Sequence, residues 1–205
     1  MKRLFLCTCI LAFAATLSAQ QHMPMGGNMP MGGHMAMGGQ KSMAKKPLLS
    51  PAAKASITID GKSITIDYNS PRVRGREGKI FTPGGLIQST HKSYPVWRGG
   101  ANAATALHTT AGITLGTLNV PAGSYTLFVD IANPNQWYLI VSKETGEWGL
   151  AYNGETDLGL TPMHMSKPPK MVEDLTYSFT HDGGNKGTLT LAWENHVASV
   201  PFTVH

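Results

Sequence analysis

Soft metal-binding side chains are concentrated in three near-copies of one hexapeptide close to the N-terminus. Seven of the eleven methionines lie between Met23 and Met43, and six of them form three Met-x-Met pairs, each followed by Gly-Gly. Thioether sulfur is a soft ligand that suits Cu(I), it carries no proton, and neutral imidazole extends such a site toward Cu(II). The tract predicts a copper site, and its donors would be His22, Met23, Met25, Met29, Met31, His34, Met35 and Met37.

The alternative for this tract is a flexible glycine-rich tether whose methionines reflect repeat expansion. A second methionine and histidine cluster, Met163-His164-Met165, stands between prolines later in the chain and would join the same metal site if it lay nearby. The competing interpretation is that Met163 and Met165 fill gaps in the packing between strands.

Basic residues gather in a second region that has the chemistry of an anion site. Arg72, Arg74 and Arg76 lie on a segment with proline and glycine, and Trp97-Arg98 follows some twenty residues later. Guanidinium groups bind carboxylate and phosphate in pairs of hydrogen bonds, and a tryptophan face can stack on a sugar. The predicted ligand-binding residues for an anion or carbohydrate are Arg72, Arg74, Arg76, Trp97, Arg98 and Asn102. The alternatives are ion pairs with nearby carboxylates for the arginines, a core position for Trp97, and a turn or cap for Asn102.

The sequence lacks the local motifs of common enzyme classes. It has no Gly-x-Ser-x-Gly nucleophile motif, no compact pair of zinc-binding histidines, and no phosphate-binding loop. We therefore expect a protein without catalytic activity. A hydrolase whose site is assembled from distant residues stays open as an alternative, because sequence spacing does not exclude a long-range pair of carboxylates.

The N-terminus predicts export. Residues 1–19 combine Lys2 and Arg3, an apolar run and a small-residue exit, which is typical of a secretory signal peptide that exports a protein to the periplasm or outside the cell. Both cysteines, Cys7 and Cys9, fall inside this segment, so we expect no disulfide in the mature chain. Removing Lys2 and Arg3 lowers the formal net charge from +5 to +3, which does not favour a nucleic-acid partner, and no later segment predicts a membrane span.

The elements that would position these residues are mainly strands. Residues 20–54 are rich in glycine, methionine and proline and predict a disordered tail, whereas residues 55–205 predict one folded domain. Apolar residues alternate with polar ones on both sides of Asp60-Gly61, which predicts a tight hairpin with Ile57 facing Ile64. The same period recurs in the segments 125–131, 137–141, 175–179, 189–193 and 200–204, and short helices would fit only at 82–88 or 101–106. This pattern predicts an all-β fold, a single antiparallel β-sandwich or open barrel with short helical pieces.

Four ordered motifs resemble one known family. They are Ser70-Pro71-Arg72-Val73-Arg74-Gly75-Arg76, Val96-Trp97-Arg98-Gly99-Gly100-Ala101-Asn102-Ala103-Ala104-Thr105, Leu118-Asn119-Val120-Pro121-Ala122-Gly123-Ser124-Tyr125-Thr126-Leu127-Phe128 and Leu189-Thr190-Leu191-Ala192-Trp193-Glu194. Over about residues 55–204 the sequence is similar to the exported bacterial family called domain of unknown function 2911. The resemblance implies an exported, mostly β domain and supplies no activity. The methionine-rich tract lies outside it.

Overall fold

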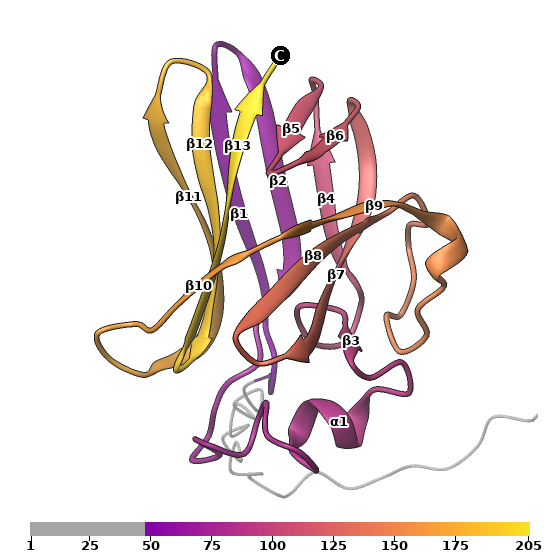
Figure 1. Cartoon of the computed structure of the whole chain (residues 1–205), viewed down its shortest axis with the longest axis vertical. Helices are drawn as coiled ribbons and strands as arrows, with labels where there is room; N and C mark the ends of the chain where they lie inside the picture. The colour runs from indigo at the N-terminus through magenta and orange to yellow at the C-terminus, as the bar shows by residue number, and fades with distance from the viewer. Residues whose placement is uncertain (1–47) are drawn as a thin grey trace, which may run out of the picture. The chain divides into compact units, whose positions relative to one another are not determined.

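The computed structural model describes residues 48–205, and its strands form two antiparallel sheets (Figure 1). The first sheet has the order β1-β2-β4-β7-β8-β9, with β3 paired to β7. Its strands are β1 (Ala52–Ile59), β2 (Lys62–Asn69), β3 (Val96–Trp97), β4 (Thr105–Thr109), β7 (Gly123–Asn133), β8 (Gln136–Ser142) and β9 (Asp157–Pro162). Within residues 48–205, no helix is long and apolar enough to cross a membrane.

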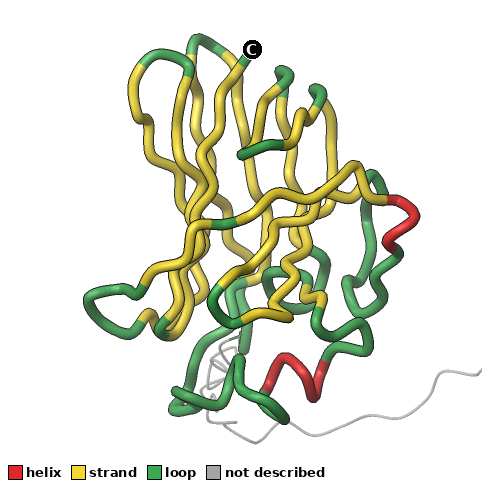
Figure 2. Tube along the Cα trace, viewed as in Figure 1, coloured by secondary structure: helices red, strands yellow, loops and turns green. Residues whose placement is uncertain are grey.

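The second sheet has the order β11-β12-β13-β5-β6, with β10 paired to β13. Its strands are β5 (Ile113–Leu115), β6 (Leu118–Val120), β10 (His164–Ser166), β11 (Val172–Gly183), β12 (Lys186–Glu194) and β13 (His196–Val204). The chain passes to the second sheet between β4 and β5, returns between β6 and β7, and passes to the second sheet again between β9 and β10. Strands dominate the trace (Figure 2). The predicted all-β class is confirmed.

The first hairpin forms as the alternation predicted. Ile57 pairs with Ile64 and Ile59 with Lys62, so the turn consists of Asp60 and Gly61. Both turn residues have positive φ, 49° and 75°, which is the backbone of a type I′ turn and matches the twist of the strands that it joins. Because the register follows from this turn, Ile59, Ile64 and Ile66 all reach the core.

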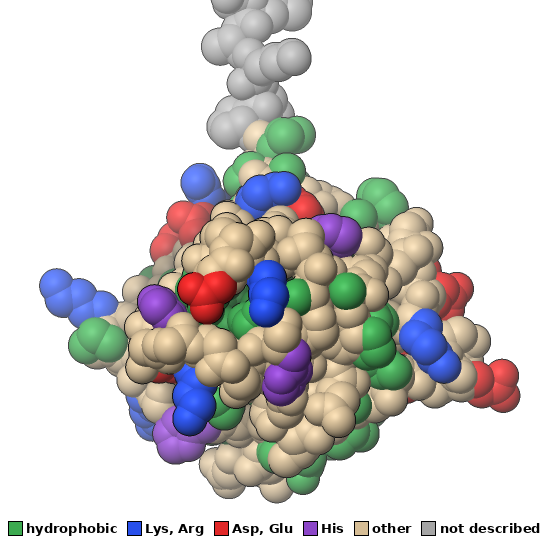
Figure 3. All heavy atoms as spheres, turned by 90° about the horizontal axis from the view of Figure 1, so that it is seen from above, with side chains coloured by type: hydrophobic (Ala, Val, Ile, Leu, Met, Phe, Trp, Pro, Cys, Tyr) green, Lys and Arg blue, Asp and Glu red, His purple; other side chains and the backbone are tan. Residues whose placement is uncertain are grey.

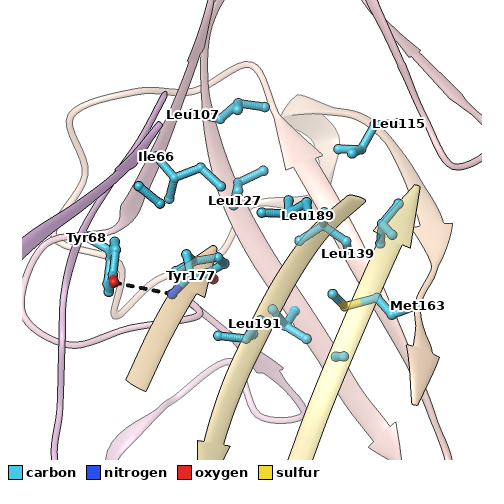
Figure 4. Packing of buried hydrophobic residues seen from close by; sticks show 14 of the residues in the cluster. Ile66, Tyr68, Leu107, Leu115, Leu127, Leu139, Met163, Tyr177, Leu189 and Leu191 are labelled. Carbon is cyan, nitrogen blue, oxygen red and sulfur yellow. Dashed lines mark hydrogen bonds between the residues drawn. The ribbon is translucent and has the colours of Figure 1, made fainter. Parts of the chain in front are cut away.

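One hydrophobic core receives side chains from both sheets. In Figure 4, Ile66 and Leu127 of the first sheet lie close to Leu189 of the second, and all three are almost completely buried. Each side chain of this size contributes roughly 1.5–3 kcal/mol by leaving water. Tyr68 and Tyr177 link the sheets as well, since the backbone N–H of Tyr177 donates to the Tyr68 hydroxyl at 3.2 Å.

The helical predictions were partly correct. Residues 48–205 contain a single short α-helix, α1 (Leu86–Thr90), which overlaps the predicted segment 82–88, and a 3-10 turn, η1, spans Gly154–Thr156. The prediction of helix at 101–106 was wrong. Asn102 adopts a left-handed backbone (φ 57°), and β4 begins at Thr105, where the alternation Thr105-Leu107-Thr109 fits a strand facing the core.

A long connection between β2 and β3 builds one end of the domain. It carries α1 and lies at the lower end of the strands in Figure 1. Its first part is fixed to β11, because the Val73 N–H donates to the Glu173 carbonyl at 2.9 Å and the Ser70 hydroxyl donates to the Leu175 carbonyl at 2.7 Å. This attachment positions the arginine-rich segment that the sequence singled out.

Candidate functional site: an arginine-lined cavity

A cavity of about 240 Å³ lies where the β2–β3 connection meets the end of β12. We call it the arginine cavity. It is lined by Leu49, Ser50, Pro71, Arg72, Arg74, Arg76, Leu86, Ile87, Thr90, His91, Arg98, Gly100, Ala101 and Trp193. Four of these residues are arginines and none is an aspartate or a glutamate, so the lining itself is basic.

Arg72, Arg74 and Arg76 each form hydrogen bonds or an ion pair that use only some of their N–H donors. Arg72 forms an ion pair with Asp174 through Nε, and Arg74 donates to the Leu49 carbonyl at 3.2 Å. Arg76 donates to two carbonyls of its own loop, those of Val73 at 2.9 Å and Arg72 at 2.6 Å. Since a guanidinium group has five N–H donors, each of these side chains keeps donors beyond the ones used here.

Arg98 approaches the cavity from the other segment, just after β3. Its Nη1 lies 3.5 Å from the Trp148 carbonyl, and its Nε is buried without a hydrogen-bond partner among the described residues. Burial lowers the pKa of Arg98. An unpaired buried donor costs about 1–3 kcal/mol, so an acceptor arriving from a ligand would be favoured at this position.

His91 contributes a buried neutral imidazole. Its Nδ1 lies 3.1 Å from the Ile87 carbonyl oxygen, so this nitrogen carries the proton and donates. Burial, followed by the charge of Arg98, lowers the pKa of His91 from 6.5 to about 4 against the opposing effect of the Ile87 carbonyl. The ring is therefore neutral near pH 7, and its Nε2 is a buried acceptor with no partner among residues 48–205.

Trp193 is the third lining residue with a buried polar atom that lacks a hydrogen-bond partner among the described residues, after Arg98 and His91. It stands at the end of β12, is 2 % exposed, and has no partner for its indole N–H in the described structure. Its ring stacks on Trp97 with centroids 5.8 Å apart. The cavity thus combines guanidinium and indole donors with one imidazole acceptor, a mixture that suits a small anion carrying a hydroxyl or an acidic proton.

The structure brings four of the six predicted ligand-binding residues to this cavity, namely Arg72, Arg74, Arg76 and Arg98. Trp97 does not line it, because the side chain is fully buried in the core and its indole N–H donates to the Gly100 carbonyl at 3.2 Å. Asn102 also lies outside the lining and donates to the Ser50 carbonyl at 3.4 Å. Its left-handed backbone matches the alternative prediction of a turn.

Sequence reasoning missed His91 and Trp193 as members of the site. His91 directly follows α1 and has no histidine at a metal-binding spacing, and Trp193 is one of several tryptophans on alternating strands. Neither spacing nor composition marks them. They meet because the fold brings the end of β12 against a connection about a hundred residues earlier in the chain.

The second methionine cluster is divided by the strand geometry. Met163 is 2 % exposed and packs in the core, where Figure 4 shows its sulfur among aliphatic side chains. Met165 packs against the same core, whereas His164 is exposed, because neighbouring residues of a strand face opposite sides. Among residues 48–205, no group of three or more histidine, cysteine or acidic side chains is arranged to hold a metal ion. The predicted donors His22 to Met37 lie outside the described residues.

The face of the domain seen from above carries charged side chains of both signs (Figure 3). Figure 3 looks onto the domain from above, and on that face basic and acidic side chains are interspersed over a largely uncharged surface. The grouping of arginines around one cavity therefore differs from the pattern on that face.

The comparisons with known proteins place the domain in a family. The family described as "Protein of unknown function (DUF2911)" matches residues 50–202, well over half of the chain. Among the curated proteins and the solved structures, none matches this chain. The matched segment contains every residue of the arginine cavity except Leu49.

Proposed function

The chain belongs to the DUF2911 family of proteins of unknown function, and we propose that its domain is a non-catalytic binding module that takes a small anion in the arginine cavity. One observation carries this proposal: four arginines from two separate segments surround a cavity whose lining contains no carboxylate. Of these four arginines, only Arg72 has a carboxylate partner among the described residues, Asp174, so the other three guanidinium groups are free to bind an acidic group supplied from outside.

The size and chemistry of the cavity narrow the ligand class. A volume of about 240 Å³ is below the range of roughly 300–1,000 Å³ that holds drug-sized ligands, so a compact ligand fits best. Arg98 and the Trp193 indole would donate to anionic oxygens, and the neutral His91 Nε2 would accept from a hydroxyl. A sugar acid, a hydroxy acid or a phosphate group has this combination.

Calorimetric titration tests the proposal. Glucuronate and inorganic phosphate are titrated into the full chain, with glucose as the uncharged comparison, and we expect binding of at least one anion and none of glucose. Arg98→Gln should weaken that binding by about tenfold to a hundredfold, because a hydrogen bond to a charged group contributes about 1.5–3 kcal/mol. Lys92→Gln removes one charge from an exposed residue outside the cavity and should change the affinity less than about threefold.

The proposal fails if neither anion binds, or if Arg98→Gln and Lys92→Gln weaken binding equally. Equal effects would mean that a diffuse positive field, and not the cavity, attracts the anion. Thermal unfolding of each variant shows whether a lost signal reflects a lost fold.

We further propose that the segment preceding the domain is exported with it and binds Cu(I). The support is the threefold Met-x-Met-Gly-Gly repeat directly behind a predicted cleavage site after residue 19. The chain from Gln20 onward should bind Cu(I), and replacing the seven methionines between Met23 and Met43 by serine should abolish it. Met171→Ser, at an exposed methionine of the domain, is the matched control. Equal copper binding by all three proteins would refute this proposal, and an N-terminus other than Gln20 in the secreted protein would refute the cleavage site.

A further inference from the structure

A second cavity, of about 380 Å³, lies beside the tight turn between β12 and β13. We call it the aromatic cavity. Its lining consists of Gly78, Phe81, Thr82, Pro83, Tyr94, Ile131, Ala132, Pro134, Trp137, Glu194, Asn195 and His196. Phe81 lies between the two cavities, since its ring contacts both Trp137, at 4.9 Å between centroids, and Trp193 of the arginine cavity, at 5.7 Å. The two sites share no lining residue.

Glu194 is the only aspartate, glutamate, lysine or arginine in this lining, and it is 2 % exposed. Trp193 pairs with His196, so Glu194 and Asn195 form the two-residue turn of the β12–β13 hairpin. Glu194 has φ 55°, a left-handed conformation that such turns usually assign to glycine at their first position. A buried acidic residue in a position that favours glycine suggests that its side chain has a use beyond the turn.

The carboxylate of Glu194 has no cationic partner in the described part of the chain. Oε1 accepts the Gly78 N–H at 2.6 Å, and Oε2 lies 3.4 Å from His196 Nδ1, which itself has no hydrogen-bond partner there. Burial, the largest effect, lowers the pKa of His196, and Lys167 lowers it further, while Glu194 opposes the change. His196 is therefore mostly neutral at pH 7 and does not neutralise the carboxylate.

Aromatic rings line the same cavity as Glu194. The His196 ring stacks on Trp137 with centroids 5.3 Å apart and meets Phe81 edge-on at 4.7 Å, while Tyr94 forms the exposed wall. Aromatic π-electrons attract a cation placed over or beside them, most strongly where water is excluded, and such rings with a carboxylate recognise alkylated ammonium groups. The neutral His196 adds one further acceptor.

We propose that the aromatic cavity binds a small organic cation, an ammonium group with apolar substituents, with Glu194 as its counter-ion. The charges near its rim are Glu77, which accepts a hydrogen bond from Asn195 Nδ2 at 2.9 Å, and Lys167, which faces His196. They offset each other in sign, so the buried carboxylate decides the charge preference of the cavity. This inference is independent of the anion proposed for the arginine cavity.

The test uses two probes that differ in charge and hardly in shape, choline and 3,3-dimethylbutan-1-ol. Calorimetric titration of the full chain should show choline binding at least about tenfold tighter than the neutral alcohol. Glu194→Gln keeps an oxygen acceptor for Gly78 and should remove that preference. Glu77→Gln removes the same charge at the rim, where the side chain is exposed, and should leave choline affinity within about threefold.

Three results would overturn the proposal. They are absence of choline binding at millimolar concentrations, equal binding of the two probes to the unaltered chain, and an unchanged preference in a folded Glu194→Gln variant. Circular dichroism and thermal unfolding establish whether that variant is folded. If it is not, the comparison of the two probes on the unaltered chain decides the question alone.

Discussion

The buried neutral His91 predicts a specific loss of stability in acid. An unfolded chain binds a proton at His91 with a pKa near 6.5, whereas the folded chain does so only near pH 4, because burial and Arg98 disfavour the charged ring. The contribution of His91 is therefore fully present above about pH 6.5 and is lost as the pH falls toward 4, where the unfolded state holds more protons. We expect the free energy of unfolding to fall over this window.

The size of the loss follows from the two pKa values. Their separation corresponds to at most about 3 kcal/mol, and water reaching the cavity screens the charge and reduces it to about 1–2 kcal/mol. Urea unfolding of the full chain between pH 7 and pH 4.5 measures it. His91→Asn retains a donor for the Ile87 carbonyl and does not titrate, so it should lose about 1–2 kcal/mol less than the unaltered chain over the same range.

The comparison isolates His91 because other groups titrate in both proteins. The pKa of His196 is also lowered by burial, and its contribution cancels in the difference. His164→Gln, at an exposed histidine, should follow the unaltered chain. Parallel stability curves for the unaltered chain and His91→Asn would refute the burial of a neutral imidazole at this position.

Three further predictions concern the fold and the cavity. Gly99→Ala should destabilise the domain by about 2 kcal/mol or more in urea unfolding, because φ is 61° and a Cβ would collide with the Tyr177 hydroxyl that donates to the Gly99 carbonyl. Met163→Ala should cost about 2–5 kcal/mol by leaving a cavity in the core, whereas His164→Ala should cost less than about 0.5 kcal/mol because that side chain is exposed. Calorimetry should show phosphate binding tightening as the pH falls from about 5.5 toward 4, since protonated His91 turns from acceptor to donor, and His91→Asn should reduce this dependence.

For each of these predictions, one experimental result would contradict it. Gly112→Ala meets no atom within 4 Å and should be nearly neutral, so an equal cost at both glycines would show that general chain stiffness, and not the Tyr177 contact, matters at Gly99. Equal costs at Met163 and His164 would contradict the burial of the first side chain and the exposure of the second. Phosphate affinity that does not change with pH would show that His91 does not face the bound anion.

The local elements of the fold were predictable because their signals are local. Asp60-Gly61 between alternating isoleucines determines both turn type and register, and the strands that end at Trp193 and Val204 follow from a period of two. The helix expected at 101–106 failed because the left-handed Asn102 and the core-facing Thr105 fit a turn and a strand better.

The candidate site was predictable only in part. The arginines stood out by type and clustering, yet their convergence with Trp193 depends on a contact between segments about a hundred residues apart. Trp97 was predicted to bind ligand but lies in the core, where its indole N–H donates to the Gly100 carbonyl. Glu194 was unexpected as a buried group, since a turn residue usually faces solvent and no sequence pattern signals a left-handed glutamate.

The central claim, that a small anion binds among the arginines, is tested most directly at the Trp193 indole N–H. This proton has no partner in the described structure and Trp193 is one of the residues that line the cavity, so a bound anion should change its environment. In ¹⁵N-labelled protein, four tryptophan indole signals are expected, and Trp193→Phe assigns the one of interest. Addition of phosphate or glucuronate should shift the Trp193 signal in a saturable manner and leave that of the fully buried Trp97, whose N–H already donates to Gly100, nearly unchanged. A Trp193 signal that does not move at saturating anion, or one that moves only in step with the other three, would contradict the account.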